Sequence, residues 1–192
     1  MTTVNPTGPA DDWERFRDFL AVLARVQGAA RWQGKIDLSG VVQQTLLEAY
    51  RAGPLLAGAP DAQKAGWLKR ALTNNLADEL RKLTTARRGG GRERSLEAEM
   101  ADSMSRLERL LPGTSATPSR QAVRQERLLQ VARALAALPD GQRQAIELHY
   151  LEERPLTEVA ELLGTTRPAV AGLLHRGMKQ LRQRLIEEGG GE

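Results

Sequence analysis

Apolar residues recur at helical spacing along most of the chain, and this periodicity predicts an all-α fold. Good helix formers such as Ala, Leu, Arg, Glu and Gln dominate, whereas runs typical of strands are almost absent. A helix pair is expected from residue 155 onward. The other expected helices cover approximately residues 12–27, 38–51, 62–83, 128–138 and 142–151.

Glycine and proline divide these helices into two groups. The stretch "RRGGGRER" ends the first group, and "LLPGTSATPSR" has the composition of a linker. We therefore predict two small helical domains, residues 1–94 and 126–187. They are joined by a flexible linker over 95–125, in which a transient helix could form, and are followed by a disordered tail over 188–192.

Positive charge gathers in two separate stretches, although the formal net charge is only +4. Lys64 to Arg94 contain nine Lys or Arg against three Asp or Glu, and Arg167 to Arg184 contain five bases and no acid. Each stretch alone is most simply a solvated helix face. Together they predict two contact points on nucleic acid.

Several classes of protein do not fit this composition. The chain has no Cys and two His, and its "RRGGGR" lacks the Lys-Ser/Thr of a nucleotide loop. We therefore expect no catalytic residue, no metal site and no cofactor. No secretory signal and no membrane span are expected either, so the predicted location is the cytoplasm.

The stretch "PLTEVAELLGTTRPAVAGLLHRGMKQLRQRL" predicts two helices joined by a tight turn. Thr157 is expected to cap the first helix and Gly164 to end it, with Thr165 or Thr166 capping the second and Pro168 in its first turn. This is the helix-turn-helix pattern of DNA-binding proteins, and an ordinary helical hairpin is the alternative. The shared core should consist of Val159, Ala160, Leu163, Val170, Leu174 and Leu181.

The second helix of this pair carries few long polar side chains early in its length. Arg167 could reach a base edge or a phosphate, whereas His175, Arg176 and Lys179 suit phosphates. Gly172 is expected to permit a close backbone approach, since a glycine inside a helix costs about 1 kcal/mol relative to alanine.

Residues 138–185 resemble the promoter −35-binding region of bacterial RNA polymerase sigma factors of the extracytoplasmic-function type. The resemblance implies contacts with double-stranded −35 DNA from Thr166, Arg167, Ala171, His175, Arg176 and Lys179. Ala171, Gly172 and Leu173 replace a common Lys-Ser-Arg, so the −35 sequence itself is not predicted. The matching residues are Leu138, Pro139, Arg143, Glu158, Ala160, Leu163, Gly164, Val170, Leu174, His175 and Arg176.

The segment "DLSGVVQQTLLEAYRA" resembles the part of the same family that grips the coiled coil of the largest polymerase subunit. Gly40 and Gln44 stand where Asp and Glu are common, so docking here is expected to be less charge-driven. The implied polymerase-binding residues are Asp37, Val42, Gln43, Gln44 and Thr45.

The segment "GWLKRALTNNLADELRK" resembles the family's −10-recognition helix. For Asn74 and Asp78, local hydrogen bonding along an exposed helix is an equally good reading, and Trp67 fits the core better than a stacking platform. The residues implied to contact single-stranded −10 DNA are Lys69, Arg70, Asn74, Asp78, Arg81, Lys82, Arg87 and Arg88.

The resemblance implies a sigma factor, which is no enzyme and which directs polymerase to promoters. Its partners would be core RNA polymerase, through the largest-subunit coiled coil and the flap, and promoter DNA, double-stranded at −35 and single-stranded at −10. Many members are held by a membrane-anchored anti-sigma factor, although no residue here identifies one. A stand-alone transcriptional regulator and a polymerase-binding scaffold are the alternatives.

Overall fold

The computed structural model describes residues 11–32, 35–83, 92–110 and 121–189. Every regular element within these ranges is helical, which confirms the all-α prediction. The elements are α1 (Asp11–Glu14), α2 (Arg17–Trp32), α3 (Leu38–Leu56), α4 (Asp61–Leu83), α5 (Arg92–Arg109), α6 (Gln121–Ala136), α7 (Asp140–Ile146), the π-helical turn η2 (Glu147–Leu151), α8 (Leu156–Leu162) and α9 (Arg167–Gly189).

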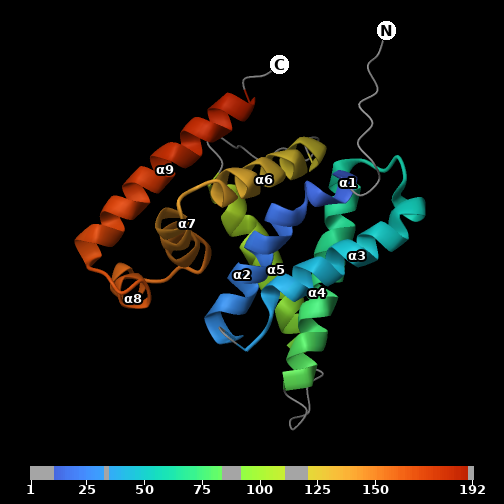
Figure 1. Ribbon diagram of the computed structural model, residues 1–192, viewed down its shortest axis with the longest axis horizontal. Helices are drawn as coiled ribbons and strands as arrows, with labels where there is room; N and C mark the ends of the chain where they lie inside the picture. The colour runs from blue at the N-terminus through green and yellow to red at the C-terminus, as the bar shows by residue number, and fades with distance from the viewer. Residues whose placement is uncertain (1–10, 33–34, 84–91, 111–120, 190–192) are drawn as a thin grey trace.

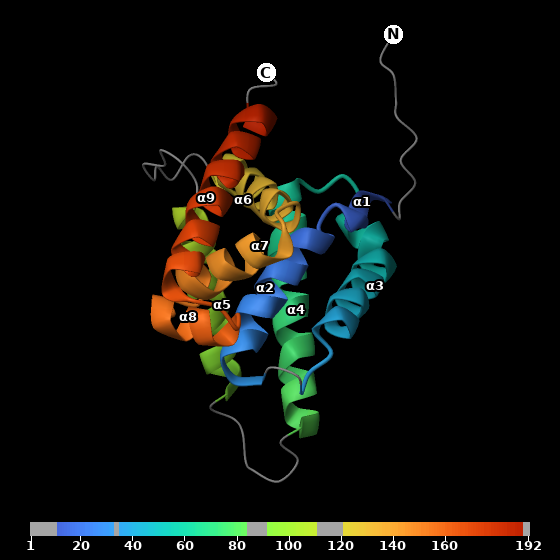
Figure 2. The same ribbon diagram turned by 60° about the vertical axis from the view of Figure 1, so that its left-hand side comes forward.

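Helix α2 lies at the centre of the molecule (Figures 1 and 2). It packs against α3 and α4 on one side, and against α5, α6 and η2 on others. Several of the largest fully buried side chains belong to this helix, including Phe19, Leu20 and Leu23. Helices α7 and α8 contact η2, and α9 packs against α6, α7 and α8.

The element boundaries differ from the predictions at two points in the N-terminal half. The first expected helix is divided by a turn at Arg15 and Phe16, which separates α1 from α2. Helix α3 continues through Pro54 to Leu56, whereas "AGPLLAGAP" was expected to break it. The helix continues because Leu56 is buried, and because a proline so near the end removes only one of the last intrahelical hydrogen bonds.

Helix α5 occupies the first part of the predicted linker, so residues 95–109 do not form a flexible tether here. Its buried side chains recur at spacings of three and four residues, which places them on one face against α2 and α4. That apolar stripe consists of Leu96, Met100, Met104, Leu107 and Leu110. Of the other expected linker residues, 111–120 lie outside the described part of the chain, and 121–125 form the start of α6.

The two predicted domains share one apolar core. Buried residues from Trp13 to Leu185 form a single continuous cluster, and α6 contacts α2 and α4 as well as α9. Ion pairs also cross between the halves, of which Arg25 with Glu147 is the most buried. The expected separation into two independent bodies therefore differs from the arrangement in this structure.

Candidate nucleic-acid interface

The turn between α8 and α9 is built by Gly164. Its φ of 60° is left-handed, a conformation that suits glycine because it has no Cβ. The amide of Thr165 donates to the carbonyl of Ala160 at 2.9 Å, and that of Gly164 donates to Glu161 at 3.1 Å. These two bonds form the Schellman motif that ends many helices, as the sequence predicted for Gly164.

The start of α9 is capped by Thr166, one of the two predicted candidates. Its Oγ1 accepts a hydrogen bond from the amide of Ala169 at 3.4 Å, and Pro168 occupies the first turn. The prediction that Thr157 caps α8 is wrong. Pro155 holds the N-cap position of α8 without a side-chain bond, and Thr157 lies inside the first turn.

The predicted core of the helix pair is confirmed. Val159 and Ala160 of α8 are buried against Val170, Leu174 and Leu181 of α9. Leu163 is half-buried and packs against the same cluster. Because α9 also packs on α6 and α7, the pair is held rigidly on the rest of the fold.

The outward face of α9 carries every residue predicted to contact −35 DNA. Thr166, Arg167, Ala171, His175, Arg176 and Lys179 are all exposed. Four of them, Arg167, Ala171, His175 and Lys179, follow one another at four-residue spacing and so lie along one side of the helix. This arrangement forms a surface with positive charge at both ends and a small residue between them.

The glycines of α9 have different surroundings. A Cβ built on Gly172 would lie 3.2 Å from Nη1 of Arg176, so the guanidinium of Arg176 folds over this position. At Gly177 a Cβ would lie 2.9 Å from Cδ1 of Ile146 and 3.2 Å from Cβ of Gln142. The close approach within the protein is therefore at Gly177, where α9 crosses α7, and sequence reasoning did not single it out.

Residues 128–181 match the family model described as sigma-70, region 4. The match begins in α6, contains α7, η2 and α8, and ends in α9. It supports a sigma factor, a class of protein that acts without catalysis in transcription initiation through RNA polymerase and promoter DNA. It also identifies the α8–α9 pair as the DNA-binding helix-turn-helix of that region.

The sigma-70 region 4 segment is stiffened by charged side chains around η2. Arg154 pairs with Glu152 at 2.8 Å and with Glu158 on α8, and the carbonyl of Arg154 lies 2.9 Å from Nδ1 of His149. Burial raises the pKa of Glu152, and the hydrogen bond from Arg154 partly offsets this effect. These contacts fix α8 relative to η2, and the half-buried ring of His149 takes part in them through Nδ1.

The residues predicted to bind polymerase divide between the surface and the interior of the fold. Asp37 is the N-cap of α3, where its carboxylate accepts from the amide of Gly40 at 3.0 Å. Val42 and Thr45 are buried, so they belong to the packed side of α3 and not to its surface. Gln43 and Gln44 are exposed.

Two exposed apolar residues extend this outward face of α3. Leu47 and Tyr50 are 43% and 52% exposed and follow Gln43 at helical spacing. Sequence reasoning missed both of them, although their spacing from Gln43 was a usable signal.

The residues predicted to contact −10 DNA lie along α4. Arg70 and Asn74 are exposed, and Lys69 is half-exposed. Asp78 is paired with Arg81, and Glu79 with Lys82 at 2.6 Å, which raises the pKa of Lys82. Arg87 and Arg88 lie outside the described residues.

A groove joins these two predicted sets of residues. It runs between the start of α3 and the end of α4, and its lining includes Asp37 and Gln44 together with Asp78, Arg81 and Lys82. The two sets are far apart in the chain, so their common surface was not predicted from the sequence. Residues of both predicted sets are therefore neighbours on the surface of the fold.

Asn75 is the residue that connects α4 to α3, and the sequence analysis did not single it out. Its Nδ2 donates to Oγ1 of Thr45 at 3.1 Å and to Oε2 of Glu48 at 3.3 Å. Thr45 in turn donates to the carbonyl of Val41 at 2.8 Å. The neighbouring Asn74 points outward, so one of the two adjacent asparagines is structural and the other is available to a ligand.

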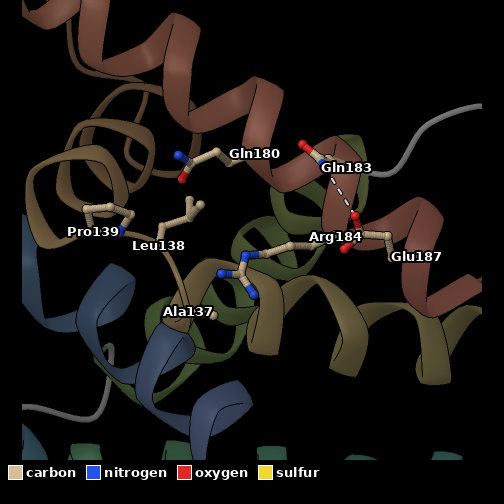
Figure 3. Close-up of a pocket in the computed structure, with 7 residues that line it drawn as sticks. All are labelled: Ala137, Leu138, Pro139, Gln180, Gln183, Arg184 and Glu187. Carbon is tan, nitrogen blue, oxygen red and sulfur yellow. Dashed lines mark hydrogen bonds between the residues drawn. The ribbon is translucent and has the colours of Figure 1, made fainter.

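A second groove lies at the C-terminal end of α9 (Figure 3). Leu138 and its two neighbours line one side, and Arg184 reaches toward them from α9, where Gln183 donates to Glu187 at 3.1 Å. No residue predicted to contact −35 DNA lines this groove.

Within the ranges that the structure covers, no group of three or more potential metal ligands comes together. The helices in those ranges also include none that is long and apolar enough to cross a bilayer.

Proposed function

We propose that the chain is a sigma factor of the extracytoplasmic-function type. It binds core RNA polymerase and directs promoter-specific initiation by recognising −10 and −35 elements and helping to open the −10 duplex. The observation that carries this proposal is the match of residues 128–181 to sigma-70 region 4, together with the exposed basic face of α9 in the same segment.

The −35 element would be bound by α9 lying in the major groove. Its small outward residue Ala171 lets the helix backbone come near the base edges, and Arg176 and Lys179 are positioned for phosphates. Arg167, at the helix N-terminus, is the residue best placed for a base edge. Recognition of this kind depends on DNA shape and phosphates more than on many base contacts.

Core polymerase would dock on the exposed face of α3. Gln43 and Gln44 supply hydrogen-bonding groups, and Leu47 and Tyr50 supply apolar area. Since the face carries few charges, binding there should depend less on salt than binding to DNA does. The coiled coil of the largest subunit is the proposed partner here, and the flap is the proposed partner of the sigma-70 region 4 segment.

The −10 element would be held single-stranded along α4. Unstacking a base costs a few kcal/mol, which contacts to the base and the phosphates must offset. Arg70 and Asn74 are exposed for this role, and Arg81 and Lys82 could exchange their carboxylate partners for phosphates.

The functional division of the chain follows the same proposal. Residues 1–94 would serve polymerase and the −10 element, 126–187 the −35 element, and 95–125 would connect them. The protein would work in the cytoplasm and on the nucleoid when bound to polymerase, without cofactor or catalysis. An anti-sigma factor is a further proposed partner.

Reconstitution with core RNA polymerase tests the function directly. Transcription from a pool of genomic fragments should start at a small set of shared sites only when the chain is present. Binding to promoter DNA without any binding to core polymerase would instead favour a stand-alone regulator.

The docking face is tested by Gln43→Arg, with Gln144→Arg on the exposed side of α7 as the matched control. The first change should abolish core binding and leave the affinity for isolated −35 DNA intact, and the control should change neither. Unchanged core binding in Gln43→Arg would remove the docking assignment.

The DNA face is tested by Arg176→Ala, with Arg133→Ala on α6 as the control. Loss of one phosphate contact should weaken −35 binding and reduce the slope of log affinity against log salt by about one unit. The control should keep the full slope, and an unaltered slope in Arg176→Ala would assign this residue another role.

A further inference from the structure

Two glycines lie inside α9, and packing within the protein accounts for only one of them. Gly177 is buried where α9 crosses α7, and a Cβ there would lie 2.9 Å from Ile146. At Gly172 the three atoms nearest to a built Cβ all belong to the guanidinium of Arg176. Because glycine is less favourable than alanine inside a helix, Gly172 weakens α9 without improving the packing of the core.

The guanidinium of Arg176 lies along α9 instead of standing straight out from it. Its Nη1, Nη2 and Cζ are 3.2, 3.7 and 3.8 Å from the place where a Cβ on residue 172 would be. Residues 172 and 176 are one turn apart, so the charge lies about 6 Å nearer the N-terminus of α9 than the Cα of Arg176 does. Long helical side chains lean in this direction, and the absence of a side chain at Gly172 leaves room for the guanidinium.

No carboxylate of α9 competes with Gly172 for this guanidinium. Residues 162–186 contain neither Asp nor Glu. None of the ion pairs within the described ranges includes Arg176, whereas Arg143 and Arg154 of the same sigma-70 region 4 segment are both paired with acids. Arg176 is therefore placed by the shape of the backbone beneath it, and its charge is not neutralised there.

The residues around Gly172 keep this strip of α9 low. Pro168, Gly172 and Arg176 follow one another at four-residue spacing and form one row along the helix (Figure 1). Pro168 and Arg176 are exposed, whereas Gly172 is half-buried although it has no side chain of its own. The guanidinium thus covers the backbone of Gly172 on the face that carries the predicted −35 contacts.

The position of this guanidinium matters because space in the major groove is limited. An α-helix with its side chains is about 10–12 Å across, and the groove is about 12 Å wide. An arginine standing out from the middle of α9 would hold the helix away from the base edges. An arginine laid along the helix leaves the backbone free to approach, and it loses less side-chain freedom when it meets a phosphate.

We propose that Gly172 is a positioning residue for −35 binding: its bare backbone seats the guanidinium of Arg176 along α9, so that the cation meets a phosphate while the helix lies close to the base edges. This inference rests on the proposed function. Gly172 acts through Arg176, so replacing the glycine weakens binding only while the arginine is present.

A double-mutant cycle over Gly172→Ala and Arg176→Ala tests this inference. Each full-length variant is assembled with core RNA polymerase. The probe is a duplex from a fragment selected in the genomic pool, cut between its −35 and −10 elements. Gly66→Ala in α4 is the matched control, because a Cβ there would meet nothing within 4 Å and the probe has no −10 element.

Gly172→Ala should weaken binding of this duplex about two- to tenfold, the range expected when one long side chain loses its preorganised position. In the Arg176→Ala background the same methyl should change binding by less than about twofold. Gly66→Ala should leave binding unchanged.

Equal losses in both backgrounds would show that the added methyl itself meets the DNA, and this result would overturn the inference. No loss in the presence of Arg176 would overturn it as well, and both results leave the proposed function standing. An unaltered holoenzyme that selects no fragment from the genomic pool would remove the proposed function and the inference with it.

Nitrogen-15 relaxation of the arginine Nε groups in the free full-length chain detects the seat without DNA or polymerase. The Arg176 signal is assigned by its loss in Arg176→Lys. Its heteronuclear NOE should exceed that of Arg182, an exposed arginine of α9 that follows Met178 at the same four-residue spacing. In Gly172→Ala it should fall to the value of Arg182. Equal values for the two arginines in the unaltered chain would overturn the inference, whatever the binding assay shows.

Discussion

Replacement of Gly177 by alanine probes the close crossing of α9 over α7. The new Cβ would lie 2.9 Å from Cδ1 of Ile146 and 3.2 Å from Cβ of Gln142. Ile146 is fully buried, so its terminal methyl has no open space to move into. At Gly172, five residues earlier on the same helix, the added methyl meets only the end of the Arg176 side chain, which can swing into solvent.

The two substitutions should therefore change stability in different directions. Each gains about 1 kcal/mol because alanine is the better helix former. Gly177→Ala also loses about 1–3 kcal/mol to overpacking, which cancels or exceeds that gain. Gly172→Ala should be the more stable of the two by about 1–3 kcal/mol, or at least about 2 °C in melting temperature for a chain of this size.

Urea unfolding of the full chain, followed by far-UV circular dichroism, measures this difference. Ile146→Val in each background completes the test, since it removes the methyl that clashes. Alone it should cost about 0.5–1.5 kcal/mol, and beside Gly177→Ala it should cost less or even stabilise. Gly177→Ala as stable as Gly172→Ala, or additive effects within about 0.5 kcal/mol, would refute the packing argument.

Three further outcomes are expected from equilibrium unfolding of single variants. Gly164→Ala should destabilise the chain by about 1–2 kcal/mol because the residue is left-handed, and Gly164→Asn should cost less; equal costs would contradict a backbone origin. Asn75→Ala should cost about 1 kcal/mol through its lost hydrogen bonds, whereas Asn74→Ala should stay within about 0.5 kcal/mol, and a reversed order would contradict the assignment. The hydrogen bond from Arg109 lowers the pKa of Glu153 below its ordinary value of 4.5, so this contact stabilises the fold above that pH and is lost as the pH falls through the lowered pKa. Glu153→Gln should therefore differ from the unaltered chain at neutral pH and converge with it in acid; a constant difference would contradict this.

The helix-turn-helix could be predicted from the sequence because its signals are local. Gly164 at the end of α8 and Thr166 at the start of α9 act within a few residues, and the structure confirms both. Thr157 failed as a cap because the preceding Pro155 already sets the start of α8. Local turn chemistry thus predicts ends of elements well unless a neighbouring residue competes for the same role.

Helix α5 was predicted only as a transient helix within the linker, although the signal for a packed helix is present. Met100, Met104 and Leu107 lie at helical spacing, but charged and small residues surround them and the stretch that follows has a linker's composition. The burial of α5 is decided by its neighbours α2 and α4, which supply the apolar faces that it covers. Tertiary packing of this kind overrides weak local preference.

The candidate site could be located only in part. Exposure of the α9 residues followed from periodicity, whereas the hydrogen bond that Asn75 donates to Thr45 joins residues 30 positions apart. The pairing of Arg25 with Glu147 spans 122 residues and leaves no periodic trace in either helix. Contacts between distant segments depend on the whole fold, and a single sequence does not display them.

Because η2 is a π-helical turn, the orientation of the helix-turn-helix depends on the number of residues in this segment. The amide of Glu152 donates to the carbonyl of Glu147 at 2.9 Å, five positions back, so this segment holds one residue more than an α-helical turn would. Deleting one residue there would restore regular winding and rotate everything downstream by about 100° about the α7 axis. An insertion or deletion in the Ala57–Pro60 turn would only lengthen or shorten a surface connection. The same change in η2 would alter the direction in which the exposed face of α9 points.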